Sequence, residues 1–382
     1  MSRSKGFNTR ALHDGERSIE RSVTQPIFQS STYIYEGEED YTAVRYGRLN
    51  NTPNHEMLSA KIASLESTED AVVTASGMSA VTTAILSLVG SGEHLLAQDN
   101  LYGGTYYFLQ DDLPFWGREV SLFPTQESET IEQYLRPNTK AIYVESISNP
   151  LLKIPDFEKI ISVAKKRGIL TLIDSTFSSP YNFNPSALGF DVVVHSATKY
   201  LNGHTDVLAG AIAGPAELLK GIRKLLCHLG PTLDPHACFL LNRGIKTLGV
   251  RISRQNDTAL KLAETIQKFP KIRKVFYPGL VSHPDYHRAQ KWFRGCGGVF
   301  SFDFDGSEEE LETALGKLTL PFNAPSLGGI ESLITRPCKT SHSGISKLER
   351  EKLGITDTLV RVSVGLEDFE DLRRDFERAL GG

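Results

Sequence analysis

The chain has 382 residues, of which 40% are hydrophobic and 23% charged, and its 42 basic and 46 acidic side chains leave a formal charge of −4. This length exceeds one simple core, and the balanced composition excludes a disordered or fibrous protein. The basic residues form no continuous stripe that could neutralise a phosphate backbone, so nucleic acid is not an expected partner.

No run of about 18 apolar residues is present, and the opening MSRSKGFNTRALHDGE lacks the apolar core of a secretory signal. We therefore expect a cytoplasmic protein with no membrane partner. The four cysteines form no CxxC pair and are too sparse for a disulfide framework. The stretch CHLGPTLDPHAC holds two cysteines and two histidines, but they lack the close spacing of zinc ligands, so no metal site is predicted.

Residues 1–54 are rich in Ser, Thr, Tyr and Arg and show little periodicity. This pattern predicts an extended arm, which we expect to contact a neighbouring subunit. From His55 to Glu66 the apolar residues recur at helical spacing and predict a helix that leads into the core.

Short apolar runs then alternate with helical stretches as far as residue 245. The runs are AVVTAS, HLLAQ, AIYVES, ILTLID, DVVVHS and VLAGAIAG. Strands buried on both faces appear as continuous apolar runs, and their alternation with helices predicts a parallel sheet with right-handed crossovers. Residues 55–245 are therefore predicted to form a doubly wound α/β domain.

A long helical stretch over residues 241–270 is predicted to link this sheet to the rest of the chain. Beyond it, GGVFSFDF, a helix near 307–317, LVRVSVG and DFEDLRRDFERAL favour a smaller unit that mixes helices and strands. We assign residues 246–382 to a C-terminal α+β domain with its linker helix.

Ligands of open parallel sheets bind outside the carboxyl ends of the strands, so the residues that end the apolar runs are considered together. Lys199, in HSATKYLNGH, follows the run DVVV among small and hydroxyl-bearing neighbours. Burial disfavours the ammonium form, so a lysine held there can lose its proton and attack an aldehyde. The alternative is a lysine paired with a neighbouring acid.

Three further segments at strand ends carry residues that could take part in chemistry. Asp174 ends the run ILTLID and could keep a pyridine nitrogen protonated, or it could cap a turn. SGMSA starts a helix after a strand, so the amides of Gly77 and Met78 with the helix dipole suit a phosphate, although such turns are common. Tyr102, in NLYGGT, could stack on a ring and accept a proton, or it could be a half-buried core tyrosine.

Arg361 lies between apolar neighbours in LVRVSVG, where an unpaired charge is costly. Its planar guanidinium suits bidentate binding of an α-carboxylate. The alternative is a salt bridge between the two domains.

These pieces together resemble the Cys/Met metabolism family of pyridoxal 5′-phosphate (PLP) enzymes, of the cystathionine γ-synthase and γ-lyase type. HSATKYLNGHTDVLAG resembles the lysine signature of that family, and IDSTFSSPYNFNPSALGFD resembles the block that carries its pyridine-nitrogen aspartate. Other matching blocks run from TRALHDG to VGLEDFEDL. The resemblance implies PLP-dependent transferase fold type I, which is aspartate aminotransferase-like, and a homotetramer built as a dimer of dimers with active sites at subunit borders.

The resemblance also implies site roles. Lys199 would bind PLP covalently and move protons, Asp174 would face the ring nitrogen, and Tyr102 would stack on the ring. The remaining cofactor residues would be Asn149 at the ring hydroxyl, Gly77, Met78, Ser196 and Thr198 at the phosphate, and Tyr46 and Arg48 from the adjacent subunit at the same phosphate. The α-carboxylate of an amino-acid substrate would bind Arg361, helped by Ser326 and Asn149.

The sequence departs from the family pattern at three places. In the arm, YGRLNNTPN keeps the Tyr-x-Arg of the family but lacks the Gly-Asn-Pro-Thr that usually follows it. Tyr107 stands where many members carry an arginine that serves distal carboxylates, which weakens the expectation that cystathionine or succinylated homoserine is a substrate. Pro325 stands where γ-lyases commonly have a glutamate, and APS resembles the plant γ-synthases.

Three functions follow as hypotheses. We favour γ-replacement on an activated homoserine, of the cystathionine γ-synthase or O-acylhomoserine sulfhydrylase type, in methionine and cysteine metabolism. The second is a C–S lyase, acting on cystathionine or methionine, that releases a 2-oxo acid and ammonia. No single residue decides between them, because replacement and elimination share their early steps. The third is a non-catalytic interaction protein, against which Lys199, Asp174 and Arg361 argue together.

Overall fold

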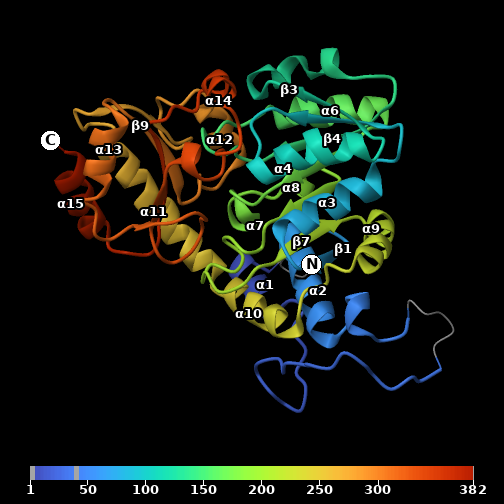
Figure 1. Cartoon of the computed structure of the whole chain (residues 1–382). Helices are drawn as coiled ribbons and strands as arrows, with labels where there is room; N and C mark the ends of the chain where they lie inside the picture. Colours follow the sequence, from blue (N-terminus) through green and yellow to red (C-terminus); the bar gives the residue numbers. More distant parts are fainter. Residues whose placement is uncertain (1–4, 38–42, 382) are drawn as a thin grey trace.

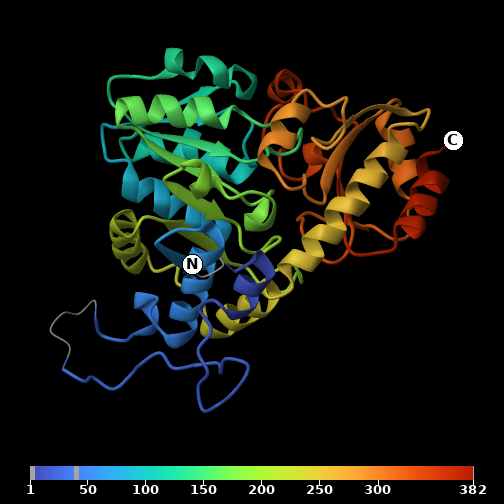
Figure 2. The ribbon, with the colours of Figure 1, turned by 180° about the vertical axis from the view of Figure 1, so that it is seen from behind.

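The computed structural model describes residues 5–37 and 43–381, which form two sheets of different size with helices packed around them (Figure 1). The larger sheet lies within residues 70–214 and the smaller within residues 272–363. Helix α11 (Leu248–Ile266) runs diagonally from the larger half to the smaller, and the same division is visible from behind (Figure 2). The arrangement agrees with the predicted large α/β unit and smaller C-terminal α+β unit.

Seven strands form the larger sheet in the order β1-β7-β6-β5-β4-β2-β3. They are β1 (Asp70–Thr74), β2 (His94–Gln98), β3 (Glu119–Phe123), β4 (Thr139–Glu145), β5 (Leu170–Asp174), β6 (Val192–His195) and β7 (Gly210–Gly214). Six of them coincide with the apolar runs of the sequence. The exception is β3, an edge strand whose sequence EVSLF is only partly buried and therefore carries no continuous apolar run.

The expectation of an all-parallel sheet is wrong at one strand. β7 runs antiparallel to both of its neighbours, β1 and β6. The segment from 196 to 209 that joins β6 to β7 contains no helix, so the chain turns back beside β6 instead of crossing over the sheet. That connecting segment carries Lys199, so the change of direction creates the loop on which the lysine stands.

Helices cover both faces of the larger sheet and pack along the smaller one. Their bounds are α1 (Phe7–His13), α2 (Pro53–Glu66), α3 (Gly77–Leu88), α4 (Gly103–Tyr107), α5 (Leu113–Phe115), α6 (Phe157–Arg167), α7 (Ser179–Asn182), α8 (Pro185–Leu188), α9 (Ala216–Leu229), α10 (Pro235–Ile245), α11, α12 (Tyr286–Trp292), α13 (Glu308–Leu315), α14 (Lys347–Leu353) and α15 (Phe369–Leu380). None of these helices of the described chain is long and apolar enough to cross a membrane.

Alternate side chains of one strand enter different cores. Val72 packs in a cluster with Ile85 of α3, whereas the next residue, Val73, belongs to a cluster with Ile62 of α2. Successive side chains of a strand point to opposite faces, so both faces of the sheet need an apolar cover. This explains why the sequence shows unbroken apolar runs in place of alternation.

Five strands form the smaller sheet in the order β10-β11-β12-β9-β8. They are β8 (Ile272–Phe276), β9 (Val299–Phe304), β10 (Phe322–Asn323), β11 (Leu333–Thr335) and β12 (Leu359–Ser363). All pairs are antiparallel except β10 with β11. β9 and β12 are fully buried and lie next to each other at the centre of this sheet, which puts Arg361 in the interior of the protein.

The single linker helix expected over 241–270 is two helices, α10 and α11. Thr247 leaves the helical conformation, with φ −108° and ψ 4°, and separates them. The N-terminal region also differs, because α1 forms where an extended arm was expected. It is held by Lys61 of α2, whose buried amine donates to the carbonyl of Ala11 at 2.9 Å and to Glu16 at 2.6 Å.

Between residue 14 and α2 the described chain is largely without regular structure and extends away from the body at the bottom of Figure 1. Its apolar side chains Val23 and Ile34 are exposed by 98% and 88%. The division at 1–54, 55–245 and 246–382, and the contact of the arm with another subunit, stay predictions.

Arg251 of α11 ties the lysine loop to the linker helices. It is buried, and its guanidinium donates to the carbonyls of Tyr200 and Gly244, both at 2.9 Å. Gly203 has φ +69°, and a Cβ atom there would lie 1.9 Å from Nη1 of Arg251, so only glycine fits beside the guanidinium. Among the described residues Arg251 forms no ion pair, and burial lowers its pKa to about 10.

We predict that Arg251→Met lowers the free energy of unfolding by about 3 kcal/mol, because buried carbonyls lose charged donors. Chemical denaturation measures the change. Arg254→Met is the matched control on the same helix, since Arg254 is exposed and pairs with Asp368 at 3.1 Å. That surface pair contributes at most about 1 kcal/mol, so equal effects of the two variants would contradict the anchoring role of Arg251.

Candidate active site

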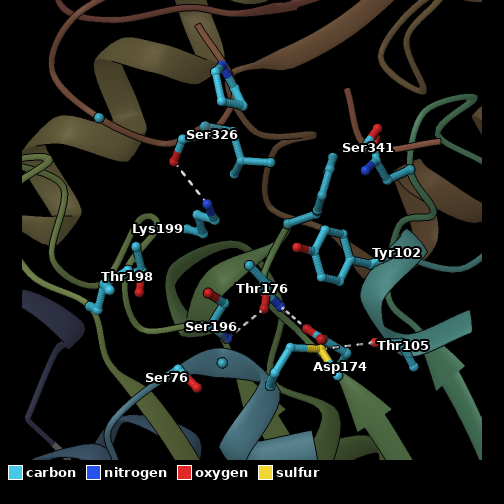
Figure 3. Close-up of a pocket in the computed structure, with 18 of the residues that line it drawn as sticks. Ser76, Tyr102, Thr105, Asp174, Thr176, Ser196, Thr198, Lys199, Ser326 and Ser341 are labelled. Atoms are coloured by element: carbon cyan, nitrogen blue, oxygen red, sulfur yellow. Dashed lines mark hydrogen bonds between the residues drawn. The ribbon is translucent and has the colours of Figure 1, made fainter. Parts of the chain in front are cut away.

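A cavity of about 890 Å³ opens between the carboxyl ends of the large-sheet strands and the smaller sheet. Ten of the residues selected from the sequence line it together: Gly77, Met78, Tyr102, Asn149, Asp174, Ser196, Thr198, Lys199, Ser326 and Arg361. Figure 3 shows several of these side chains converging from the two halves of the molecule. The structure therefore brings the predicted site residues together, with two exceptions described below.

Lys199 projects into the middle of the cavity from the loop between β6 and β7. Its Nζ donates to the hydroxyl of Ser326 at 2.8 Å (Figure 3). Burial, and then the charge of Arg361, lower the pKa of Lys199 to about 8. Lys199 takes part in none of the ion pairs of the described residues, so the alternative of a lysine paired with an acid has no support.

Asp174 forms the floor of the cavity at the end of β5. One carboxylate oxygen accepts the backbone N–H of Thr176 at 2.9 Å. The side chain of Glu145 lies beside it, because Glu145 at the end of β4 is the register partner of Asp174. Burial raises the pKa of Asp174, and neither carboxyl forms an ion pair within the described chain. The floor is thus acidic and lacks a cation.

The N-terminus of α3 supplies a second polar wall. The side chain of Ser76 caps the helix by accepting the N–H of Ser79 at 3.0 Å, and Gly77 follows it. A Cβ atom on residue 77 would lie 2.6 Å from the hydroxyl of Ser196, so the close approach of these two segments requires glycine. The hydroxyl of Ser196 thus lies beside a helix N-terminus, an arrangement that suits an anion. Thr198 lines the same cavity, and its hydroxyl accepts the backbone N–H of Ala209 at 2.9 Å.

Arg361 reaches the cavity from β12 and is only 5% exposed. Its guanidinium donates to Oδ1 of Asn149 at 3.1 Å and to the carbonyl of Ser326 at 2.8 Å, while Nε has no partner. Burial lowers the pKa of Arg361 to about 10. Since no described carboxylate pairs with it, the alternative of an interdomain salt bridge is not supported.

Ser326 contacts both cationic side chains. Its hydroxyl accepts from Lys199 and its carbonyl accepts from Arg361. It has φ +100°, a backbone conformation that costs free energy for any residue other than glycine and persists only where its surroundings impose it. The two hydrogen bonds are part of those surroundings.

Tyr102 lies at the start of α4 with its ring in the cavity, 47% exposed (Figure 3). Its backbone N–H donates to Glu145 at 2.6 Å. The half-buried core position considered for this tyrosine does not apply, because its ring lines the cavity and is open to a ligand.

The two exceptions are Tyr46 and Arg48, which do not line this cavity. Arg48 donates to the carbonyl of Cys227 at 2.8 Å, and its guanidinium lies 5.6 Å from the ring centre of Tyr46. Their expected role concerns a second chain, so it stays a prediction.

The cavity also includes residues that the sequence did not single out. Thr176 accepts the N–H of Ser196 at 2.8 Å, and Thr340 and Ser341 form part of the outer wall. Thr176 could have been found from its place two residues after Asp174. The other two lie in a segment with no periodic pattern. Among the described residues no group of His, Cys, Asp or Glu side chains could hold a metal ion, and all four cysteines are free.

Comparison with known proteins agrees with this geometry. Residues 8–381 match the model of a family described as Cys/Met metabolism PLP-dependent enzyme. The chain is 42% identical over 375 residues to cystathionine gamma-lyase of Bacillus subtilis, covering 97% of this chain and 98% of the relative. It is 39% identical over 383 residues to a chloroplastic cystathionine gamma-synthase of Nicotiana tabacum, covering 97% of this chain and 71% of the relative.

A solved structure described as an O-acetylhomoserine (thiol)-lyase from Campylobacter jejuni superposes with a TM-score of 0.93 at 32% identity. The match covers 99% of this chain and 100% of that one, and that protein contains an N′-pyridoxyl-lysine-5′-monophosphate group. These similarities confirm the predicted family and the predicted fold type I.

We predict that the rate at which the apoprotein captures PLP rises about tenfold per pH unit below pH 8 and levels off above it. Only the neutral amine of Lys199 can attack the aldehyde, and its pKa is about 8. Borohydride trapping between pH 7 and 9, followed by peptide mapping, measures the reaction at this residue. Lys199→Ala should give no label in its peptide; a label on another lysine, or a rate that is flat with pH, would contradict the assignment.

Proposed function

The chain belongs to the Cys/Met metabolism family of PLP-dependent enzymes, and from that premise we propose that it catalyses γ-replacement on an activated homoserine. The observation that carries the proposal is the cavity, in which the amine of Lys199 and the guanidinium of Arg361 face one space of about 890 Å³. This volume is near the upper end of the range for small-molecule sites, so the cavity offers room for a cofactor together with an amino acid and a thiol.

The residues of the cavity fit PLP in three respects. Within the described part of the chain Lys199 is a half-buried amine without an acidic partner, and the carboxyl group of Asp174 forms no ion pair. The capped N-terminus of α3 with the hydroxyls of Ser196 and Thr198 offers donors for a phosphate. We propose that these residues, with Gly77, Met78, Tyr102 and Asn149, hold the cofactor.

The side chains of the cavity would have different roles in the reaction. Bound PLP supplies an electron sink for charge that develops at the α-carbon of the amino acid. Lys199, freed when the substrate amine takes its place, would accept the α proton and return it at a neighbouring carbon, which a pKa of about 8 suits. Arg361 would bind the α-carboxylate and so fix which bond faces the cofactor. Ser326 would orient the amine of Lys199 through its hydroxyl.

The substituent at the γ position of the bound substrate is proposed to be uncharged, as in an O-acetyl ester. Among the described residues that line the cavity, the cations are Lys199 and Arg361, and both have roles already. Much of the remaining lining is apolar, and it includes Phe177, Val207, Leu208, Pro325, Leu327 and Leu333. A second carboxylate or a phosphate on the substrate would be desolvated there without a partner.

The second candidate is elimination by a C–S lyase, of the cystathionine or methionine type. It is favoured by the 42% identity to the Bacillus subtilis protein named cystathionine gamma-lyase. The same cavity and the same lysine would serve both reactions, so the assignment depends on the product formed.

We also propose that the chain assembles as a homotetramer, a dimer of dimers, in which residues 1–54 contact an adjacent subunit and bring Tyr46 and Arg48 to its phosphate site. The exposed apolar side chains Val23 and Ile34 on a segment without regular structure support a partner for this region. A cytoplasmic location stays a prediction.

A product assay separates the two reactions. With O-acetylhomoserine and cysteine we expect a thioether, and we expect added thiol to suppress 2-oxobutanoate. Release of 2-oxobutanoate that is unaffected by thiol would identify a lyase. In the same assay, kcat/KM for O-succinylhomoserine and O-phosphohomoserine should be at least about tenfold lower, corresponding to about 1.4 kcal/mol for one unpaired charge. Equal values would contradict the uncharged substituent at the γ position.

Arg361→Met should lower kcat/KM by about 100-fold, or about 3 kcal/mol, mainly through KM, because the α-carboxylate loses a buried charged donor pair. The absorbance of bound PLP should be retained. The second measurement compares the amino acid with its methyl ester: the original protein should prefer the free carboxylate and the variant should not. A variant that keeps this preference would show that Arg361 does not bind the carboxylate.

A further inference from the structure

Two carboxyl groups stand side by side at the floor of the cavity. Glu145 ends β4 and Asp174 ends β5, and the two residues are register partners in neighbouring parallel strands. Partners in this position point to the same face of a sheet, and both side chains line the cavity. The cofactor has one ring nitrogen to be faced, so the two acids require different roles.

Their environments differ. Asp174 is half-buried and lines the cavity, and one of its carboxylate oxygens accepts the backbone N–H of Thr176. Glu145 is only 4% exposed, and its Oε1 accepts the backbone N–H of Tyr102 at 2.6 Å. Glu145 is therefore turned toward the start of α4, while Asp174 remains available to a ligand.

No Lys or Arg of the described chain pairs with these two carboxyls. Lys199 is bonded to Ser326, and Arg361 is bonded to Asn149 and Ser326. The charge of His195, which is bonded to Glu66, acts to lower the pKa of Asp174 and not that of Glu145. Two adjacent carboxyls in a poorly solvated site are not ionised together, because their like charges repel each other strongly. Burial, and then the charge of Asp174, raise the pKa of Glu145 well above its usual range.

We propose that Glu145 is a positioning residue that stays protonated and fixes the backbone of Tyr102, leaving Asp174 as the single anion beneath the cofactor ring. This inference rests on the proposed function, since it assumes that PLP binds in this cavity. The two acids at the floor of the cavity would then have separate roles: Asp174 would supply the negative charge, and Glu145 would fix the position of Tyr102.

The geometry at Tyr102 explains why such a residue is needed. Tyr102 precedes the first turn of α4, and a Cβ atom on Gly104 would lie 2.7 Å from its ring, so the ring is tightly confined by its own helix. The hydrogen bond to Glu145 fixes the other side of the residue. Without that acceptor the backbone N–H of Tyr102 would be unpaired, and the position of the stacking ring would be less well fixed.

The test compares three variants of the full chain reconstituted with PLP: Glu145→Gln, Glu145→Ala and Asp174→Asn. The dissociation constant of PLP is measured by absorbance titration, and the visible circular dichroism of the bound cofactor reports the orientation of its surroundings. The Gln variant should bind PLP within about threefold of the original protein, because its amide is neutral and still offers a carbonyl to Tyr102. The Ala variant should bind roughly 10- to 100-fold more weakly with altered dichroism, and the Asn variant should lose affinity while the ring environment of Tyr102 is kept.

Two results would overturn the inference. If Glu145→Gln weakens PLP binding as much as Asp174→Asn, Glu145 acts as a second anion. If Glu145→Ala matches the original protein, Glu145 does not position Tyr102. Should the Ala variant fail to fold, the infrared spectra of the original protein and of Glu145→Gln are compared. The inference requires a band of a protonated carboxyl group that is present in the original protein and absent from the variant. Unchanged PLP affinity in Asp174→Asn would instead reject the cofactor site itself, which separates the two proposals.

Discussion

Two cationic side chains, one half-buried and one buried, share one cavity without a carboxylate partner among the described residues, and they impose the main physical constraint on this protein. Lys199 comes from the larger sheet and Arg361 from the smaller, and Ser326 accepts a hydrogen bond from each. Burial lowers the pKa of both groups, and the charge of Arg361 lowers the pKa of Lys199 further. Keeping these charges away from water lowers the stability of the ligand-free protein. An anionic ligand would offset part of that cost, so ligand binding is expected to raise the stability of the fold.

The rest of the fold supplies the means to hold these charges in place. The antiparallel return of β7 creates the loop that bears Lys199, and Arg251 fixes that loop by donating to the carbonyl of Tyr200. On the other side, the central position of β12 buries the stem of Arg361 between fully buried strands. The positive φ of Ser326 then brings one residue within reach of both cations. These structural features lie in different parts of the sequence, and the site exists only when both sheets are assembled.

The sequence predicted much of this site because residues at the ends of apolar runs share one edge of a parallel sheet. Asp174 and Lys199 follow such runs directly, and the signal survives even though β7 is antiparallel. Strand direction was not predictable, because an apolar run is the same in either direction. The contact of Glu145 was not predictable either. The sequence places Glu145 at a strand end, but its hydrogen bond with the N–H of Tyr102 joins segments 43 residues apart, which no local pattern indicates. The proposed role of Tyr46 and Arg48 concerns a second chain, so the structure of a single chain does not test it.

The order of charges through the cavity gives a ligand one preferred orientation. The floor is acidic at Asp174, the middle holds the amine of Lys199, and Arg361 stands on the wall of the smaller sheet. Beyond these groups the lining is mostly apolar, and at the rim Asp206 adds a negative charge. An amino acid bound as proposed, with its carboxylate at Arg361 and its amine at Lys199, would place its side chain among the remaining lining residues, which are mostly apolar. An additional anion on that side chain would meet this apolar surface and the carboxylate of Asp206, so the charges that would orient the substrate would also disfavour a charged substituent at the γ position.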